Sequence, residues 1–237
     1  MTRVEVLEST GNAEYGRRPE FTFTNPNTLL FLTGAPLSGK STIAPIIASS
    51  IEGCAQQSMD IIRLMAQETE AYKPENERNP FVQYGSCDSY VFVGDGSYSP
   101  ENLVGGFNAY SEAVTSLLTR IIPKLETQGV RNVLFEGVQL TPRILAPYLV
   151  DSNRLIIVTS SEEQLLKNRD KLFGEDHKLL DRYSIDRLLL LQDEILRQSK
   201  DVPSDKILCV DNTQDYDTTV SSIISLLLSG GVIQPQE

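Results

Sequence analysis

The feature that most constrains this chain is an eight-residue run, Gly34-Ala35-Pro36-Leu37-Ser38-Gly39-Lys40-Ser41. It matches the pattern G-x-x-x-x-G-K-[ST] in full. It follows residues 28–33, whose continuous apolar sequence predicts a strand buried on both faces, and it precedes a predicted helix at about 41–50. Such a turn presents backbone N–H groups to an anion, and the helix N-terminus adds partial positive charge. The run therefore predicts a phosphate-binding loop.

Residue types within this loop predict its ligands. We expect Lys40 to reach the β- and γ-phosphates of a nucleoside triphosphate, and the Ser41 hydroxyl to bind Mg²⁺. ATP and Mg²⁺ are therefore the predicted cofactors. The predicted ATP-binding residues are Gly34, Ala35, Pro36, Leu37, Ser38, Gly39, Lys40, Ser41 and Thr42.

Apolar stretches alternate with helical patterns along the rest of the chain. The further strands are expected at 54–59, 130–135, 154–159 and 207–210. The further helices are expected at about 61–69, 107–125, 179–198 and 218–228. This alternation predicts an α/β fold with a doubly wound, mainly parallel sheet flanked by helices. We expect residues 1–27 to be a lead-in with a short strand at 4–7, and residues 28–237 to form one domain.

Residues 74–106 interrupt the alternation. They are rich in proline, glycine and aromatic residues, and the segment is too long for a simple connection. We expect loops and short strands here. Long irregular segments on a rigid scaffold often bind substrate, so this insert is the predicted acceptor-binding region.

Charge and composition exclude several classes of protein. Thirty-two acidic residues against 21 basic ones give a formal net charge of −11, which argues against binding nucleic acid by phosphate neutralisation. A small anion responds to the local field instead, so phosphate ligands stay open. No apolar run reaches the roughly 18 residues of a membrane span. The polar N-terminus and three scattered cysteines predict a reduced, cytoplasmic protein.

Three polar residues follow predicted strands and suggest the chemistry. Glu136 is a single acid before a glycine, which suits contact with Mg²⁺; motor-type ATPases usually have paired acids there. Asp60 and Arg63 are three residues apart and share a face on the first turn of a helix. We expect Asp60 either to cap that helix or to take the proton of an attacking hydroxyl, and Arg63 to bind the acceptor or the transferring phosphate.

Several segments together resemble the 2-phosphoglycerate kinase family of P-loop kinases, over roughly residues 29–228. The matching segments are the phosphate loop through Ala44, then 60–65, 86–90, 106–107, 135–142, 182–187 and 210–212. The stretch Glu136–Pro142 is the more specific one, although Gln139 stands where that family has histidine. The resemblance implies a kinase-type P-loop NTPase fold. It also implies an ATP-dependent phosphotransferase for a small phosphorylated or carboxylate-bearing acceptor similar to 2-phosphoglycerate.

The resemblance also implies roles for individual residues, with a lid at about 162–178. The implied catalytic residues are Lys40, Asp60, Arg63 and Arg169, the metal residues are Ser41 and Glu136, and the acceptor residues are Arg63, Ser86, Ser89 and Tyr90. The lid arginine is either Arg169 or Arg182.

Two other functions remain open. One is a nucleotide switch or hydrolytic ATPase that acts through a protein partner. The other is a kinase for a macromolecular hydroxyl such as a nucleic-acid end. The net charge disfavours this second function unless Arg63, Arg169 and Arg182 form a basic cleft.

Overall fold

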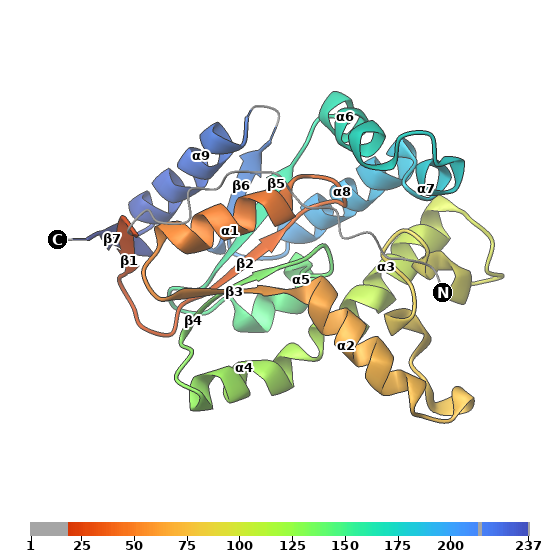
Figure 1. Ribbon diagram of the computed structural model, residues 1–237, viewed down its shortest axis with the longest axis horizontal. Helices are drawn as coiled ribbons and strands as arrows, with labels where there is room; N and C mark the ends of the chain where they lie inside the picture. The colour runs from red at the N-terminus through yellow and green to blue at the C-terminus, as the bar shows by residue number, and fades with distance from the viewer. Residues whose placement is uncertain (1–18, 213–214, 237) are drawn as a thin grey trace.

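A five-stranded parallel sheet forms the centre of the computed structural model, which describes residues 19–212 and 215–236 (Figure 1). The strand order is β3-β4-β2-β5-β6, with β2 (Leu29–Thr33) in the middle. The other strands are β3 (Cys54–Ser58), β4 (Asn132–Glu136), β5 (Arg154–Thr159) and β6 (Ile207–Asp211). The predicted α/β class with a parallel sheet is confirmed. The short strand predicted at 4–7 lies outside the described residues.

Apolar side chains on both faces of the central strands explain why these segments are buried. Leu30 and Leu32 of β2 belong to one hydrophobic core, and Phe31 between them belongs to the other. Successive residues of a strand point to opposite faces, so a continuous apolar run serves a sheet that is covered on both sides.

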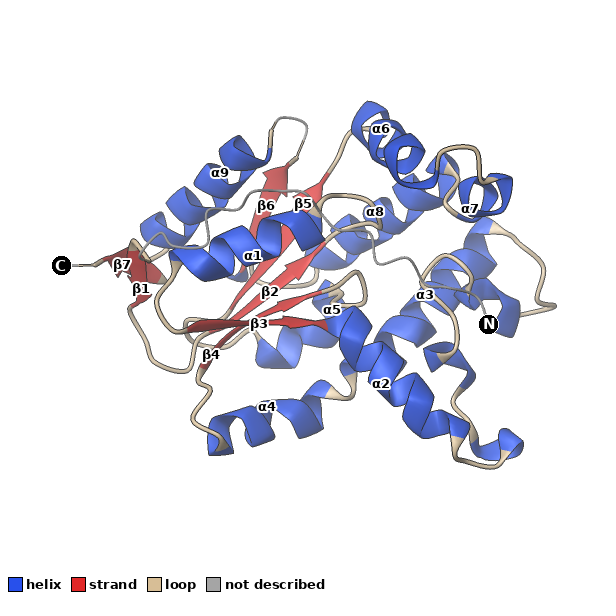
Figure 2. Ribbon diagram, viewed as in Figure 1, coloured by secondary structure: helices blue, strands red, loops and turns tan. Residues whose placement is uncertain are grey.

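Helices cover both faces of the sheet (Figure 2). α1 (Lys40–Ser50) and α9 (Tyr216–Ser229) lie on one face and share one core with Leu30. α3 (Pro100–Thr115), α4 (Leu118–Thr127), α5 (Pro142–Leu145) and α8 (Ile185–Ser199) contribute to the core on the other face. α2 (Met59–Ala71) continues directly from β3 at the edge of the sheet. None of the helices of the described ranges is long and apolar enough to cross a membrane.

The insert at 74–106 contains short helices where we expected short strands. The 3₁₀ helices are Glu75–Glu77, Pro80–Val82 and Ser89–Phe92. α3 begins at Pro100, seven residues before the expected start, because Ser99 accepts the Asn102 N–H as an N-cap and proline fits the first helical position. Gly106 lies inside α3, and a Cβ at this position would stand 2.5 Å from the backbone of Ser89. Close packing of the insert on α3 therefore requires this glycine.

Two predicted helices are each divided in the structure. α3 ends at Thr115 and α4 begins at Leu118, so the helix predicted at 107–125 is wrong as one element. The helix predicted at 179–198 is also two, α7 (His177–Arg182) and α8, separated at residues 183–184. The predicted lid region, residues 162–178, contains α6 (Glu162–Phe173) and the first two residues of α7.

A small two-stranded antiparallel sheet, which the sequence did not predict, joins segments near the two ends of the chain. β1 (Phe21–Phe23) pairs with β7 (Ile233–Pro235), with Thr22 opposite Gln234. Phe23 and Ile233 both enter the core beside α1 and α9. This pairing lies at the end of the molecule opposite the insert (Figure 1).

Candidate active site

The predicted phosphate loop connects the carboxyl end of β2 to the first turn of α1. Three of its residues have positive φ: Gly34 (152°), Leu37 (67°) and Gly39 (90°). A side chain at Gly34 would overlap the Val158 carbonyl oxygen, so only glycine fits. Leucine rarely adopts a positive φ, and the strain is tolerated where the backbone must turn its N–H groups to a common centre. The loop therefore combines positive φ at three residues with a glycine that no larger residue can replace.

Two asparagines from distant segments hold this loop. Asn212, just after β6, donates from Nδ2 to the Ser38 carbonyl oxygen at 2.8 Å. Asn168 on α6 donates from Nδ2 to the Leu37 carbonyl oxygen at 2.8 Å. Thr219 donates its hydroxyl to Asn212 Oδ1 and orients that amide. The carbonyl oxygens of Leu37 and Ser38 therefore accept hydrogen bonds from side chains outside the loop. Asn212 follows a strand end, a signal that our assignment of site residues did not use.

Lys40 folds back over the loop and is only 6% exposed. Its Nζ donates to the Ala35 carbonyl oxygen at 2.8 Å and to Ser38 Oγ at 3.4 Å. Burial lowers the pKa of Lys40, while the negative charges of Glu136 and Asp60 raise it. A buried cation is stabilised by an anion beside it, so the amine suits a phosphate ligand.

Ser41 and Glu136 meet beneath the phosphate loop. The Ser41 hydroxyl donates to Glu136 Oε1 at 3.1 Å. Glu136 is the last residue of β4 and pairs in register with Leu32 of β2. Burial raises the pKa of Glu136, while Lys40 and the hydrogen bond from Ser41 lower it.

These two oxygen donors fit Mg²⁺, which usually binds one or two protein groups and completes its shell with phosphate oxygens and water. Among the described residues no group of three or more His, Cys, Asp or Glu could hold a metal.

Asp60 lies exposed in the first turn of α2. Its charge raises the pKa of Lys40 and of Glu136, which places it at the same end of the sheet. Gln139 Nε2 donates to Asp60 Oδ1 at 3.4 Å. The capping role predicted for Asp60 is wrong, because α2 begins at Met59 and Ser58 is its N-cap residue.

Arg63 contacts the insert one turn further along α2. Its Nη1 donates to Gln67 Oε1 and to the Val82 carbonyl oxygen, both at 3.3 Å. Val82 belongs to the insert, so Arg63 joins the helix that carries Asp60 to the predicted acceptor-binding segment.

The three insert residues predicted to bind the acceptor differ in accessibility. Ser86 and Ser89 are buried, and the Ser89 hydroxyl donates to the Ser86 carbonyl oxygen at 3.0 Å. Tyr90 is partly buried, with its ring edge-on to Tyr98 at 5.6 Å. Arg187 of α8 lies over both rings, 4.2 Å from the Tyr98 centroid and 5.2 Å from the Tyr90 centroid. Our assignment of site residues missed this role of Arg187.

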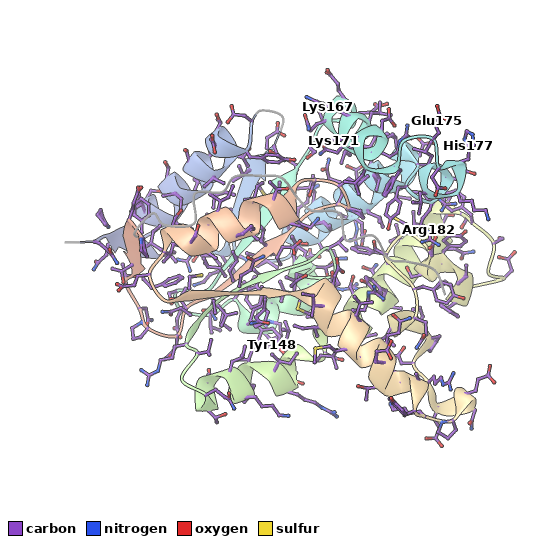
Figure 3. The ribbon with its side chains drawn as sticks, in the orientation of Figure 1. Tyr148, Lys167, Lys171, Glu175, His177 and Arg182 are labelled. Carbon is purple, nitrogen blue, oxygen red and sulfur yellow. The ribbon has the colours of Figure 1, made fainter. Side chains whose placement is uncertain are left out.

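The two candidate lid arginines have different partners; Figure 3 labels one of them, Arg182. Arg169 on α6 binds its neighbour Asp170 through Nε and Nη2 at about 3.0 Å. Arg182 at the end of α7 pairs with Asp88 of the insert, with Nε 2.7 Å from Oδ2. Within residues 19–212 and 215–236 no hydrogen bond or ion pair joins these two arginines to each other or to Arg63.

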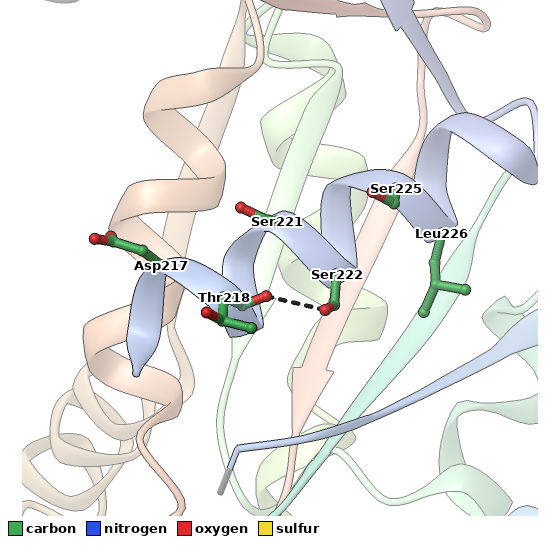
Figure 4. A pocket seen from close by; sticks show the side chains of 6 residues that line it. All are labelled: Asp217, Thr218, Ser221, Ser222, Ser225 and Leu226. Carbon is green, nitrogen blue, oxygen red and sulfur yellow. Dashed lines mark hydrogen bonds between the residues drawn. The ribbon is translucent and has the colours of Figure 1, made fainter. Parts of the chain in front are cut away.

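Two surface hollows lie away from the phosphate loop. One, of about 620 Å³, runs along α9 and is lined from that single helix, where Ser222 Oγ donates to the Thr218 carbonyl oxygen (Figure 4). The other, of about 340 Å³, lies between α2, α3 and α4. A hollow lined by one helix has no opposing wall, so the first is not a candidate ligand site.

Comparisons with known proteins give similarity of fold only. No protein-family model matches the chain, and no curated protein matches it. A shikimate kinase from Aquifex aeolicus is similar with a TM-score of 0.47 and 15% identity, over 85% of this chain and 97% of that one. A gluconokinase from Sinorhizobium meliloti has a TM-score of 0.45 and 16% identity, over 86% and 93%. An uncharacterised protein from Eubacterium ventriosum has a TM-score of 0.43 and 11% identity, over 86% and 99%. The predicted membership of the 2-phosphoglycerate kinase family is thus not shown.

Proposed function

We propose that this protein is an ATP-dependent phosphotransferase that acts on a hydroxyl of a small anionic acceptor. One observation carries the proposal: three groups converge at the carboxyl ends of the parallel strands. They are the buried Lys40 of the phosphate loop, the hydrogen-bonded pair Ser41 and Glu136, and the exposed Asp60. The Asp60 charge is near enough to raise the pKa of both Lys40 and Glu136. In open parallel sheets ligands bind at this edge.

The nucleotide half of the site consists of the phosphate loop and its first helical turn. Backbone N–H groups of the loop other than at Pro36, which has none, would bind the phosphates together with the Lys40 amine, and Ser41 with Glu136 would hold Mg²⁺. When bound, the metal would neutralise charge on the β- and γ-phosphates. Lys40 adds positive charge where negative charge accumulates during transfer.

The acceptor half is built around Asp60 and Arg63. The acceptor oxygen would attack the γ-phosphorus, the bond from that phosphorus to the bridging oxygen would break, and Asp60 would take the hydroxyl proton. Arg63 would bind a phosphate or carboxylate of the acceptor, as a guanidinium pairs well with either. A 2-phosphoglycerate-like metabolite has both groups. Ser86 and Tyr90 of the insert are proposed acceptor contacts. The Ser89 hydroxyl could bind the acceptor only after breaking its hydrogen bond to the Ser86 carbonyl oxygen.

For the lid arginine we propose Arg169. Its partner in the structure is its own neighbour Asp170, which is exposed, so the guanidinium is able to leave it at little cost. Arg182 is instead engaged by Asp88 of the insert at 2.7 Å.

The test is ATP consumption against a panel of phosphorylated and carboxylate-bearing hydroxy acids and sugars, with each product identified by mass spectrometry. The proposal expects ADP release coupled to a phosphorylated acceptor. Lys40→Ala should abolish turnover, and Lys124→Ala, which removes an exposed lysine on α4, should not. ADP release that is equal with and without every acceptor would favour the hydrolytic ATPase.

A further inference from the structure

Gln139 is fully buried in the tight turn that follows β4, and its side chain contacts the exposed Asp60. Its backbone is fixed from two sides. Thr115 Oγ1 on α3 donates to the Gln139 carbonyl oxygen at 3.0 Å, and the Thr141 N–H donates to the same oxygen at 2.9 Å. The position of the Gln139 backbone is therefore set by the fold.

The amide of this side chain faces Asp60 with its nitrogen. Nε2 donates to Asp60 Oδ1 at 3.4 Å, and Oε1 is buried without a hydrogen-bond partner. The reverse orientation would aim Oε1 at the carboxylate and bury the NH₂ group without that acceptor, so the contact with Asp60 determines the orientation. Gly137 provides the space, because a Cβ there would lie 2.6 Å from Gln139 Oε1 and 2.7 Å from Met59 Cβ.

Packing alone does not explain a glutamine at this position. A buried amide with an unsatisfied oxygen lowers stability compared with an apolar side chain of similar size. The advantage of a glutamine here therefore has to come from its hydrogen bond to Asp60. Within residues 19–212 and 215–236, Gln139 is also the one side chain that hydrogen-bonds Asp60.

We propose that Gln139 is a positioning residue, whose amide holds the Asp60 carboxylate so that its second oxygen faces the acceptor hydroxyl. The inference rests on the proposed function, in which Asp60 takes the acceptor proton. Gln139 binds Oδ1 and leaves Oδ2 to receive that proton while the acceptor oxygen bonds to the γ-phosphorus. A carboxylate without this contact turns about its side-chain torsions and spends less time in the productive orientation.

The test compares Gln139→Met, which keeps the length of the side chain and removes the N–H donor, with Thr141→Val. The second variant removes a buried, unpartnered hydroxyl from the same turn and has no bond to Asp60, so it controls for disturbance of the turn. Crystal structures of both variants and the wild type report the Asp60 side chain. We expect one Asp60 rotamer in the wild type and in Thr141→Val, and more than one in Gln139→Met.

Kinetics give the second measurement. In Gln139→Met, kcat for acceptor phosphorylation should fall roughly 10-fold or more, because misplaced groups lose much of their effect, while KM for ATP stays constant. Thr141→Val should keep kcat within about two-fold, because it replaces a buried, unpartnered hydroxyl by a methyl group of the same shape. A KM for ATP that rises as kcat falls would indicate general damage and would overturn the positioning role.

The outcomes separate this inference from the proposed function. An unchanged single Asp60 rotamer in Gln139→Met overturns the inference, even where acceptor phosphorylation is observed. A wild type that phosphorylates no acceptor overturns the proposed function, and the crystal structures still decide whether Gln139 orients Asp60. If Gln139→Met fails to fold, Gln139→Leu, which also lacks the N–H donor and is uncharged, gives the same comparison.

Discussion

A buried carboxylate between α3 and α8 gives a quantitative prediction. Glu194 accepts bonds from Arg197 Nε at 2.7 Å, from Gln198 Nε2 at 2.7 Å and from Asn108 Nδ2 at 3.1 Å. Burial raises the pKa of Glu194, but these hydrogen bonds outweigh it and lower the pKa to about 2, against an ordinary value of 4.5. Arg197 forms an ion pair with Glu194, three residues before it in α8.

The shifted pKa of Glu194 converts into stability. A shift from 4.5 to about 2 corresponds to about 3 kcal/mol, at 1.36 kcal/mol for each unit. Arg197 is 57% exposed, so screening reduces the value to about 2 kcal/mol. Since the folded-state pKa is depressed, the contribution is present above pH 4.5 and is lost as the pH falls towards 2. Glu194→Gln should therefore lower the free energy of unfolding by about 2 kcal/mol at pH 7 and by roughly half as much or less near pH 3.

Urea unfolding followed by circular dichroism at both pH values measures this difference. Asp193→Asn is the matched control, because it removes the neighbouring carboxylate, which is exposed. It should change stability by less than about 0.5 kcal/mol at either pH. Equal destabilisation by Glu194→Gln at pH 7 and pH 3 would refute the linkage, and a larger effect of Asp193→Asn would indicate that Arg197 pairs with Asp193 instead.

Three further predictions concern the candidate site. Asp60→Asn should lower acceptor phosphorylation by about 10² to 10⁴ while acceptor-free ATP hydrolysis persists, and equal loss of both would exclude Asp60 as the acceptor base. Lys40→Ala should lower turnover by at least about 10², measured as ADP release, with the circular dichroism spectrum unchanged; near-normal turnover would exclude the phosphate-loop assignment. Tyr90→Ala should raise KM for the acceptor and leave ATP affinity, measured by calorimetry, nearly constant; a fall in ATP affinity alone would contradict an acceptor role for the insert.

The parts of the fold that could be predicted are those with a local cause. β5 (Arg154–Thr159) has the predicted bounds, because an apolar run buried on both faces is visible in a window of six residues. β1 and β7 were missed since each has three residues and pairs with a segment at the other end of the chain. The early start of α3 had a local signal in Ser99-Pro100, and the glycines that follow concealed it.

The candidate site also has parts that the local sequence predicts and parts that it does not. The phosphate loop is contiguous, so its conformation follows from eight neighbouring residues. Glu136 ends β4, and Asp60 lies two residues after the end of the neighbouring strand β3. Parallel strands bring their carboxyl ends to one edge of the sheet. The contact between Gln139 and Asp60 spans 79 positions, and that between Asn212 and Ser38 spans 174. No pattern of spacing reports such contacts, because they depend on the turns that aim each side chain.

The insert shows why residue type alone is weak evidence for ligand contact. Serine and tyrosine hydroxyls that bind a substrate also satisfy buried backbone groups and pack against arginine. Ser89 uses its hydroxyl for the Ser86 carbonyl, and the Tyr90 ring supports Arg187, so both have structural partners before any acceptor arrives. Asp60 differs, because it is exposed and its single hydrogen bond among the described residues is to Gln139. A group whose second oxygen has no protein partner is the one that an acceptor hydroxyl can reach without breaking a contact, and Asp60 is therefore the stronger candidate for chemistry.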